Sequence, residues 1–123
     1  MIRGTDFIVY EVSDFDRAVN FYTEILGLKL TKKIDSFGWA EFDVYPTTLA
    51  LGSTEHEARL PSTGGASIAL AVAGLSAFVD TLKNKKVRIL REVGETPVCC
   101  MAMIEDPDGN RIILHERKDG TFG

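Results

Sequence analysis

The stretch IEDPDGNRIILHE, residues 104–116, predicts two antiparallel strands joined by a tight turn. The central DPDG has turn chemistry: the proline fixes one backbone angle, the aspartates can bind nearby amides, and the glycine tolerates a positive φ. A strand with one wet face should alternate apolar and polar residues, yet Ile112 and Ile113 are adjacent. If Ile112 and Leu114 face the core, Ile113 lies on the opposite face. That second face is either surface or the wall of a pocket.

Length, charge and cysteine content limit the class of protein. The chain of 123 residues is long enough for one domain, or for two small modules that share a core. Its net charge of −4 is spread along the sequence without a basic block, which argues against nucleic-acid binding. Residues 1–12 contain no long apolar run, so we expect neither a signal peptide nor a membrane segment, and a cytoplasmic location. Cys99 and Cys100 are adjacent and cannot close a useful disulfide loop, so we expect reduced thiols.

The first half of the chain predicts a strand, a helix and three further strands. Residues 6–12 alternate and contain β-branched and aromatic side chains, as strands do. Ser13 or Asp14 is expected to cap a helix that ends at Gly27, because apolar residues recur between them at helical spacing. The three strands are expected at residues 28–34, 38–44 and 47–53.

The same order begins again after a polar segment at 54–65 that is rich in charge, proline and glycine. A strand at 67–72 is followed by a helical apolar pattern between Leu75 and Leu82. Three more strands are expected at 87–92, 98–105 and 110–116. Matching positions in the two halves lie 60 residues apart, which indicates an internal repeat.

The repeat predicts two βαβββ modules within one domain at 1–123. The first module covers 6–53, the linker 54–65 and the second module 66–117. A single module would leave one face of a four-stranded sheet uncovered, so two modules must pair. We therefore expect an α+β fold whose helices lie on the outer faces and whose opposite faces enclose a cleft.

Two segments mark the ends of the repeat, namely VSDFDRAVNFYTEILGLKL at 12–30 and MIEDPDGNRIILHE at 103–116. They resemble the opening of a module and the closing hairpin in the superfamily of glyoxalases, bleomycin-resistance proteins and extradiol dioxygenases, also called vicinal oxygen chelate proteins. The resemblance extends over essentially the whole chain. It implies paired βαβββ modules in curved, eight-stranded, cup-like sheets, a homodimer, and a small-molecule site inside the cup.

In metal-dependent members, as the resemblance implies, four side chains that face the cup hold a divalent ion. The matching positions here are Phe7, a residue at or next to Ala50, Ser67 and Ile113. Phenylalanine, alanine and isoleucine have no donor atoms, and Ser67 alone cannot hold an ion that needs about three protein ligands. We therefore expect no metal at this position and no cofactor, and the case for metal-assisted lyase or dioxygenase chemistry loses its main support.

Strand alternation from these positions predicts an apolar cup with a few charged groups, which is typical of a small-molecule pocket. The candidate ligand-binding residues are Phe7, Val9, Glu11, Trp39, Glu41, Ser67, Ala69, Met101, Met103, Arg111, Ile113 and His115. Three further residues are expected on the same faces, namely Asp43, Ala71 and Cys99.

Several of these candidates also have an ordinary structural explanation. Trp39 either stacks on a ligand or covers a cleft, and the methionines either line a pocket or fill irregular core space. Glu11 and Arg111 either serve a ligand or form an ion pair with each other. His115 is either a general base or a solvated side chain. His56 belongs to a charged linker that could also cover the cup as a flap.

Three functions fit this pattern. The first is a metal-independent protein of the bleomycin-resistance type, a homodimer that binds a small, partly apolar or aromatic molecule, either neutral or cationic, in a cup at the interface between modules or subunits. The second is an enzyme, for example a lyase, isomerase or dioxygenase, that uses Glu11, Glu41 or His115 as an acid or base or in an atypical metal site. The third is a structural or partner-binding module with an empty cup, since fold does not fix function. We favour the first because the predicted cup combines apolar walls with acidic groups.

Overall fold

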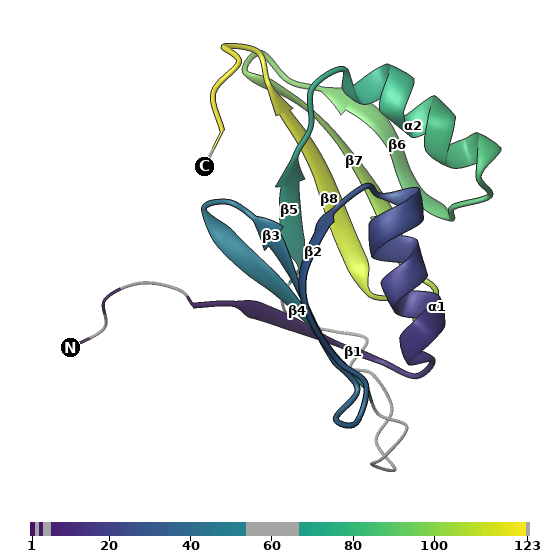
Figure 1. Ribbon diagram of the computed structural model, residues 1–123. Coiled ribbons are helices and arrows are strands. Elements are labelled where there is room, and N and C mark those ends of the chain that lie inside the picture. The colour runs from purple at the N-terminus through teal and green to yellow at the C-terminus, as the bar shows by residue number, and fades with distance from the viewer. Residues whose placement is uncertain (2, 4–5, 54–66, 123) are drawn as a thin grey trace. The chain divides into compact units, whose positions relative to one another are not determined.

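The computed structural model describes residues 1, 3, 6–53 and 67–122. These residues fall into two compact units, the first within 1–63 and the second within 64–123. In the described parts, eight strands form two mixed sheets of four, and each sheet has its own helix (Figure 1). The predicted α+β class with βαβββ modules is therefore confirmed. The predicted linker at 54–65, with His56 and its role as a flap, lies outside the described residues.

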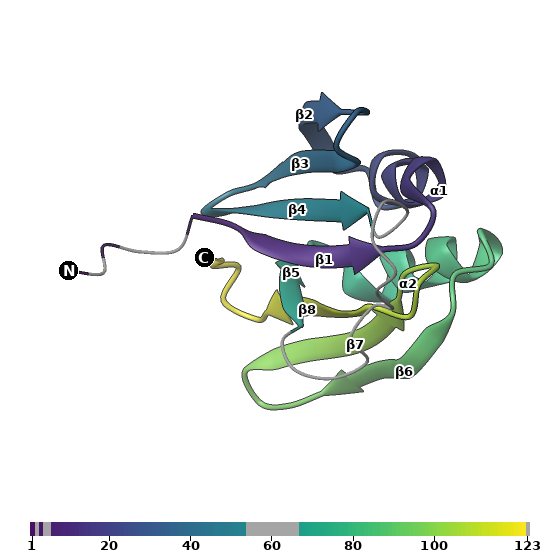
Figure 2. The ribbon, with the colours of Figure 1, turned by 90° about the horizontal axis from the view of Figure 1, so that it is seen from below.

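The first unit has the chain order strand, helix and three strands. Its elements are β1 (Ile8–Val12), α1 (Phe15–Asn20), the π-helix η1 (Phe21–Ile25), β2 (Lys29–Ile34), β3 (Trp39–Val44) and β4 (Thr47–Ser53). The strand order in the sheet is β1-β4-β3-β2, as Figure 2 shows, with β1 parallel to β4 and the other pairs antiparallel.

The second unit repeats this topology. Its elements are β5 (Ile68–Ala71), α2 (Leu75–Asn84), β6 (Ile89–Glu95), β7 (Cys99–Glu105) and β8 (Arg111–Arg117). The strand order is β5-β8-β7-β6, and β5 runs parallel to β8. The repeat inferred from sequence spacing is thus a repeat of topology.

The helix of the first unit begins where the sequence predicts but changes its form. Asp14 is the N-cap, and its side chain accepts a hydrogen bond from the Arg17 amide at 3.1 Å. The sequence predicted a continuous α-helix, but from Phe21 the chain forms a π-helix. Within this helix the Thr23 hydroxyl donates to the Val19 carbonyl at 2.8 Å, the acceptor that the Thr23 amide would use in an α-helix. This competition accompanies the wider turn, and the helix still ends before Gly27, which has a φ of 75°.

One face of each sheet packs against the helix of its own unit. In the first unit the buried residues of the helix and of the sheet face that packs against it are Tyr10, Val12, Phe15, Ala18, Val19, Phe21, Tyr22, Leu26, Ala40, Phe42, Leu49 and Leu51, whereas Ala50 is buried on the other face. The rings of Tyr22 and Phe42 lie with their centroids 5.6 Å apart and both side chains are fully buried. Burial of these large rings supplies much of the stability of the unit.

The second unit answers the question raised by the two adjacent isoleucines. Ile112 is 0% exposed and packs with other fully or nearly fully buried residues. These are Ile68, Leu75, Val79, Leu82, Ala102, Ile104 and Leu114. Ile113 is only partly buried and lies on the face away from the helix. The alternation inferred from sequence is therefore correct for this strand.

The turn before β8 is held by one buried carboxylate. Asp106 is 3% exposed, and its Oδ1 accepts hydrogen bonds from the amides of Asp108 at 2.9 Å and Asn110 at 2.8 Å. Its Oδ2 accepts from the side-chain amide of Asn110 at 2.9 Å. Gly109 has a φ of 84°, which only glycine adopts without strain. The predicted turn chemistry is confirmed.

Helix α2 has a cap that comes from a distant strand. Its N-cap residue is Gly74, which has a φ of 68° and no side chain to offer. The Glu116 carboxylate instead accepts hydrogen bonds from the amides of Gly74 at 2.7 Å and Leu75 at 3.1 Å. The bond from Leu75 has the larger effect and the bond from Gly74 the smaller, and both lower the pKa of Glu116 from its ordinary value. The start of α2 is thus attached to the end of β8.

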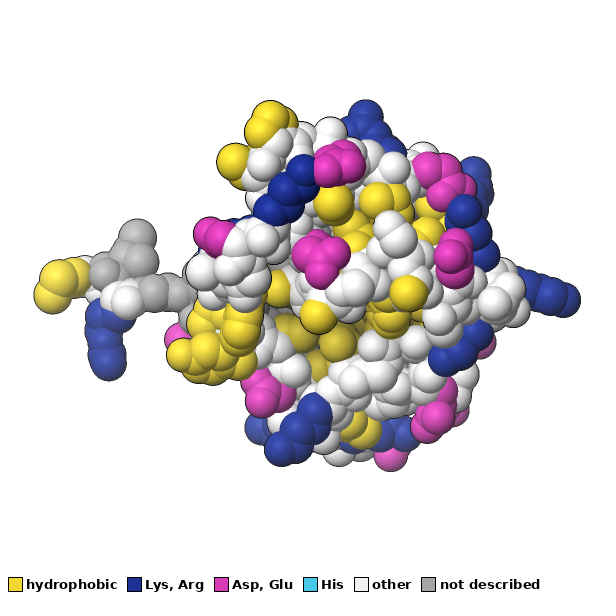
Figure 3. Space-filling model, turned by 90° about the horizontal axis from the view of Figure 1, so that it is seen from above, with side chains coloured by type: hydrophobic (Ala, Val, Ile, Leu, Met, Phe, Trp, Pro, Cys, Tyr) yellow, Lys and Arg dark blue, Asp and Glu magenta, His cyan; other side chains and the backbone are white. Residues whose placement is uncertain are grey.

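The surface carries no large area of one charge in the view of Figure 3, where acidic and basic side chains are interspersed. No helix in the described part of the chain is both long and apolar enough to cross a membrane.

We predict that Ile112→Ala and Ile113→Ala differ strongly in stability. Ile112→Ala opens a cavity in a fully buried core and should lower the free energy of unfolding by about 2–5 kcal/mol. Ile113→Ala removes a partly exposed side chain from the other face and should cost about 1 kcal/mol or less. Urea unfolding of both variants measures the difference, and similar losses would contradict the face assignment.

We predict that Glu116→Gln destabilises the protein in a pH-dependent way. Because the folded-state pKa of Glu116 is lowered from 4.5, the carboxylate stabilises the fold above its unfolded pKa, and this contribution is lost as pH falls through the folded pKa. The melting temperature of the variant should therefore lie below that of the wild type at pH 7, and the gap should close as the solution is made more acidic than pH 4. A gap that stays constant over this range would show that the charge of Glu116 is unimportant.

Candidate functional site

The face of the first sheet opposite α1 carries an exposed aromatic pair. Phe7 directly precedes β1, and its ring meets the Trp39 ring edge-to-face with centroids 5.7 Å apart. The Phe7 side chain is 48% exposed and Val9 is 44% exposed, while Trp39 is partly buried. Gly52 is the strand partner of Trp39, and a Cβ at Gly52 would lie 3.6 Å from the Trp39 ring. The indole therefore rests over a residue that has no side chain.

A carboxylate fixes the orientation of that indole. The Trp39 Nε1 donates a hydrogen bond to Glu41 Oε2 at 2.8 Å, and both residues are on β3. Glu41 is paired with Ala50, which is in turn paired with Val9, so these three residues form one row across the face. A negative charge thus lies beside an aromatic surface. Strand alternation in the sequence predicts both residues on this face but does not predict the hydrogen bond between them.

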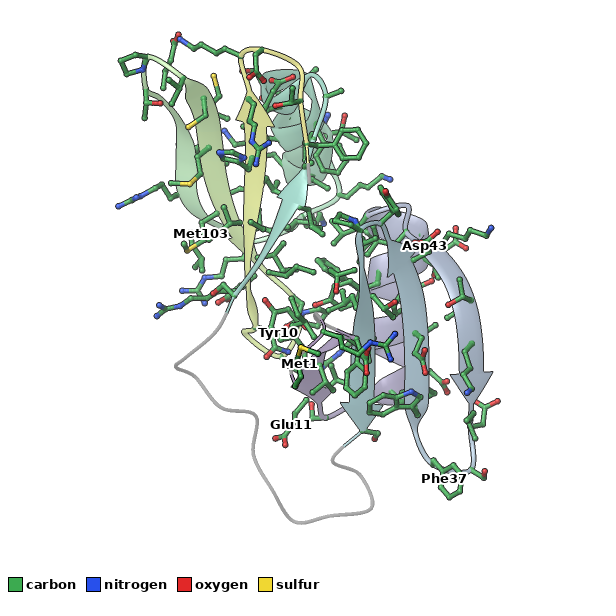
Figure 4. The ribbon with its side chains drawn as sticks, turned by 90° about the vertical axis from the view of Figure 1, so that its left-hand side faces the viewer. Met1, Tyr10, Glu11, Phe37, Asp43 and Met103 are labelled. Atoms are coloured by element: carbon green, nitrogen blue, oxygen red, sulfur yellow. The ribbon has the colours of Figure 1, made fainter. Side chains whose placement is uncertain are left out.

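The two other acidic candidates of this unit lie apart from each other. Glu11 is paired with Gly52 in the row of Trp39, whereas Asp43 is paired with Thr48. Figure 4 shows Glu11 and Asp43 at opposite ends of the first sheet. Glu41 is the carboxylate whose hydrogen bond orients the indole of the aromatic pair.

Two lysines on β2 escaped the sequence analysis. Lys29 is the strand partner of Asp43 and Lys32 is the strand partner of Glu41. Simple alternation along β2 places Lys29 and Lys32 on opposite faces, but a register shift between Leu30 and Lys32 brings both beside carboxylates. The acidic character of this face is therefore lower than the sequence predicted.

The corresponding face of the second sheet carries sulfur atoms and a histidine. Met101 and Met103 alternate along β7 with the buried residues Ala102 and Ile104, which face the helix, and Cys99 continues the same alternation, so the three share the outer face. Met101 is the strand partner of His115, and Met103 is the strand partner of Ile113. On the far side of β8, Ala69 and Ala71 of β5 complete the same two rows.

Basic residues also lie on this second face. Arg111 pairs with Glu105 and Arg117 pairs with Cys99 on adjacent strands. Arg91 of β6 pairs with Met103, again through register shifts that alternation in sequence does not reveal. Only Arg111 of these three arginines was predicted on this face, so its basic character was not expected from the sequence.

The structure divides the candidate ligand-binding residues between the two units. The first unit holds Phe7, Val9, Glu11, Trp39 and Glu41, and the second holds Ser67, Ala69, Met101, Met103, Arg111, Ile113 and His115. Within each unit the candidates that belong to strands share the face away from the helix. A cup shared by both units, and an ion pair between Glu11 and Arg111, stay predictions.

The residues at the implied metal position do not fit a divalent ion. Ala50 lies in one row with Val9 and Glu41, so its methyl group belongs to the face opposite α1. Of Phe7, Ala50, Ser67 and Ile113, Ser67 alone has an oxygen, and a catalytic ion needs about three protein ligands. Across the described ranges, no three His, Cys, Asp or Glu side chains gather closely enough to bind one.

Comparison with known proteins identifies relatives over nearly the whole chain. Residues 4–114 match the model of the Glyoxalase/Bleomycin resistance protein/Dioxygenase superfamily. The Arabidopsis thaliana protein named "Probable lactoylglutathione lyase, chloroplastic" is 33% identical over 89% of this chain, but this chain spans 35% of its length. Lactoylglutathione lyase of Salmonella typhimurium is 30% identical, with 91% of each chain covered.

A solved structure of similar size comes from a different functional class. TnmS3, an antibiotic binding protein from Streptomyces sp. CB03234, has 26% sequence identity and a TM-score of 0.77. The match covers 95% of this chain and 98% of TnmS3. Relatives of both a catalytic and a binding class therefore share this fold.

Proposed function

Because the chain belongs to the glyoxalase/bleomycin resistance protein/dioxygenase superfamily, we propose that it is a metal-independent binding protein for flat, cationic aromatic molecules. The family resemblance inferred from the sequence is confirmed by this match. In this proposal the protein acts as a homodimer and sequesters its ligand. The observation that carries the proposal is the partly exposed Phe7–Trp39 pair with the Glu41 carboxylate bonded to the indole.

This arrangement favours a flat ligand for a geometric reason. Edge-to-face and offset contacts between rings contribute about 0.5–1.5 kcal/mol beyond simple burial. The Trp39 indole is held by the bond to Glu41 and rests over Gly52, so little side-chain freedom is lost when a ligand stacks on it. Phe7 and Val9 extend the apolar surface beside it.

The same arrangement favours a positive charge on the ligand. A cation over the face of an indole gains about 0.5–2 kcal/mol, and a nearby carboxylate adds Coulomb attraction. Glu41 places that carboxylate within hydrogen-bond distance of the ring itself. A neutral or anionic ring would gain only the stacking contribution.

The comparisons support a binding role alongside the geometry. TnmS3 binds an antibiotic, as its name says, and is similar to this chain over almost its whole length. Binding needs no catalytic ion, which agrees with the hydrocarbon side chains of Phe7 and Ile113 at two of the four implied ligand positions.

A lyase is the second candidate, because relatives at 27–33% identity are named lactoylglutathione lyase. In this case Glu11, Glu41 or His115 would act as acid or base or build an atypical metal site. Glu41 already accepts a hydrogen bond from Trp39. The binding role therefore has the stronger support from the side chains.

We predict that 9-aminoacridinium, a flat cation, quenches the fluorescence of Trp39, the single tryptophan of the chain. Phe7→Leu should weaken binding about two- to tenfold through loss of the ring contact. Glu41→Gln can still accept the indole hydrogen bond but loses the charge, so it should weaken binding of the cation about fivefold. Fluorescence titration measures all three dissociation constants.

An acridine that carries a carboxylate in place of the amino group serves as the matched probe, and its binding should not weaken in Glu41→Gln. Glu24→Gln removes an exposed carboxylate from the helix of the same unit and should leave both titrations unchanged. Equal binding of the two acridines to the wild type, or quenching by neither, would refute the proposed ligand class.

We predict that protein purified without chelator contains far less than one equivalent of zinc, nickel, iron or manganese per chain. Elemental analysis gives these contents directly. Incubation with each metal should produce no lactoylglutathione lyase activity in a standard assay, since the implied ligand positions lack donors. A stoichiometric metal that disappears in Glu11→Gln or His115→Ala would favour the lyase instead.

A further inference from the structure

Strand β7 gathers soft metal ligands on one face of the second unit. Cys99 and Met101 are partly buried and share this face. Ala102, which lies between Met101 and Met103, is fully buried on the helix side. Thiolates and thioethers bind soft metal ions well and bind hard ions such as Mg²⁺ or Mn²⁺ poorly. A third ligand would be needed to build a site here.

The neighbouring strands supply that ligand and leave space around it. His115 of β8 is the direct strand partner of Met101. On the other side of Met101 the strand partner is Gly94, where an added Cβ would meet no neighbouring atom closer than 4.0 Å. Beyond His115 the row ends in Ala71. Met101 and His115 are therefore the only long side chains in a row flanked by a glycine and an alanine.

Cys99 is held in place by the turn that precedes it. The Thr96 hydroxyl accepts hydrogen bonds from the amides of Val98 at 3.3 Å and Cys99 at 3.0 Å. The Thr96 amide donates to the Cys99 carbonyl at 2.8 Å, and the Thr96 hydroxyl lies 3.2 Å from the Cys99 sulfur. These contacts fix the backbone from which the thiol projects, which favours a preformed ligand position.

We propose that Cys99, Met101 and His115 form a binding site for a soft monovalent metal ion, Cu(I) or Ag(I). Thiolate, thioether and imidazole are the ligand types that such ions prefer. The ion replaces the thiol proton of Cys99, which passes to solvent, and the imidazole binds in its neutral form. The site is distinct from the implied divalent position of the family, whose matching residue on β8 is Ile113.

Strand geometry places the three side chains within reach of one ion. The Cβ atoms of a directly opposed pair such as Met101 and His115 are about 5 Å apart, and a diagonal pair such as Cys99 and His115 is separated by about 7–8 Å. Metal–sulfur bonds of about 2.3 Å and metal–nitrogen bonds of about 2 Å, added to the lengths of these side chains, span those gaps. Met103 starts roughly 13 Å along the strand from Cys99 and faces Ile113, so it lies outside the site.

The experiment titrates reduced protein with Ag(I) by calorimetry and, without oxygen, with Cu(I) in competition with a chromogenic Cu(I) chelator. The wild type should bind one equivalent of either ion and should not bind Mn(II). Cys99→Ser should weaken binding about a hundredfold or more, and Met101→Leu and His115→Ala about tenfold or more, because each loses a direct ligand.

Two matched controls lie on the same strand. Cys100→Ser removes the adjacent thiol, which projects from the opposite face, and Met103→Leu removes the other thioether, which faces Ile113. Both should bind the ions as the wild type does, and circular dichroism should show that all variants are folded. Equal loss in Cys99→Ser and Cys100→Ser, or unchanged affinity in Met101→Leu, would show that free thiols alone capture the ion and would overturn the proposal. Because the aromatic pair lies in the other unit, this result is independent of acridine binding.

Discussion

The two-residue period of the β-strand is the constraint on which this structure depends. In β8 this period puts Ile112 and Leu114 on the buried face that packs against the helix and puts Ile113 on the opposite face. The same period gives the first sheet one face buried under α1 and another with Trp39 and Glu41. A shift of one residue would exchange the two faces completely, so the buried rows also determine which residues are available for binding.

The sequence predicted the elements of the fold well because their signals are local. Turn residues, the Asp14 cap and the alternation of the strands each depend on a few neighbouring residues. The π-helix after Asn20 was not predicted, because the apolar residues keep the spacing of an α-helix there. The contacts of the Thr23 hydroxyl with the Val19 and Asn20 carbonyls, which accompany the wider turn, leave no mark on that spacing. Some strand ends agree with prediction and others differ by up to three residues, which is expected where the last pair of a ladder depends on its partner.

The candidate site was predicted less completely, because it depends on contacts between strands. Alternation alone placed Trp39 and Glu41 on one face, but their hydrogen bond requires particular side-chain rotamers. The register shifts that bring Lys32 beside Glu41 and Arg91 beside Met103 arise only when strands pair. The charge of each face was therefore not predicted, although strand alternation did place the apolar candidates on the face away from the helix.

The cap of α2 has a consequence for how the protein matures during synthesis. Helix α1 has its cap, Asp14, immediately before it, so that helix can be capped as soon as its own residues leave the ribosome. Helix α2 begins at Leu75, but the carboxylate that caps it follows 41 residues later in the chain. The second half therefore cannot complete its native contacts while translation is in progress at β7, and residues 75–84 lack the carboxylate that caps them until Glu116 emerges.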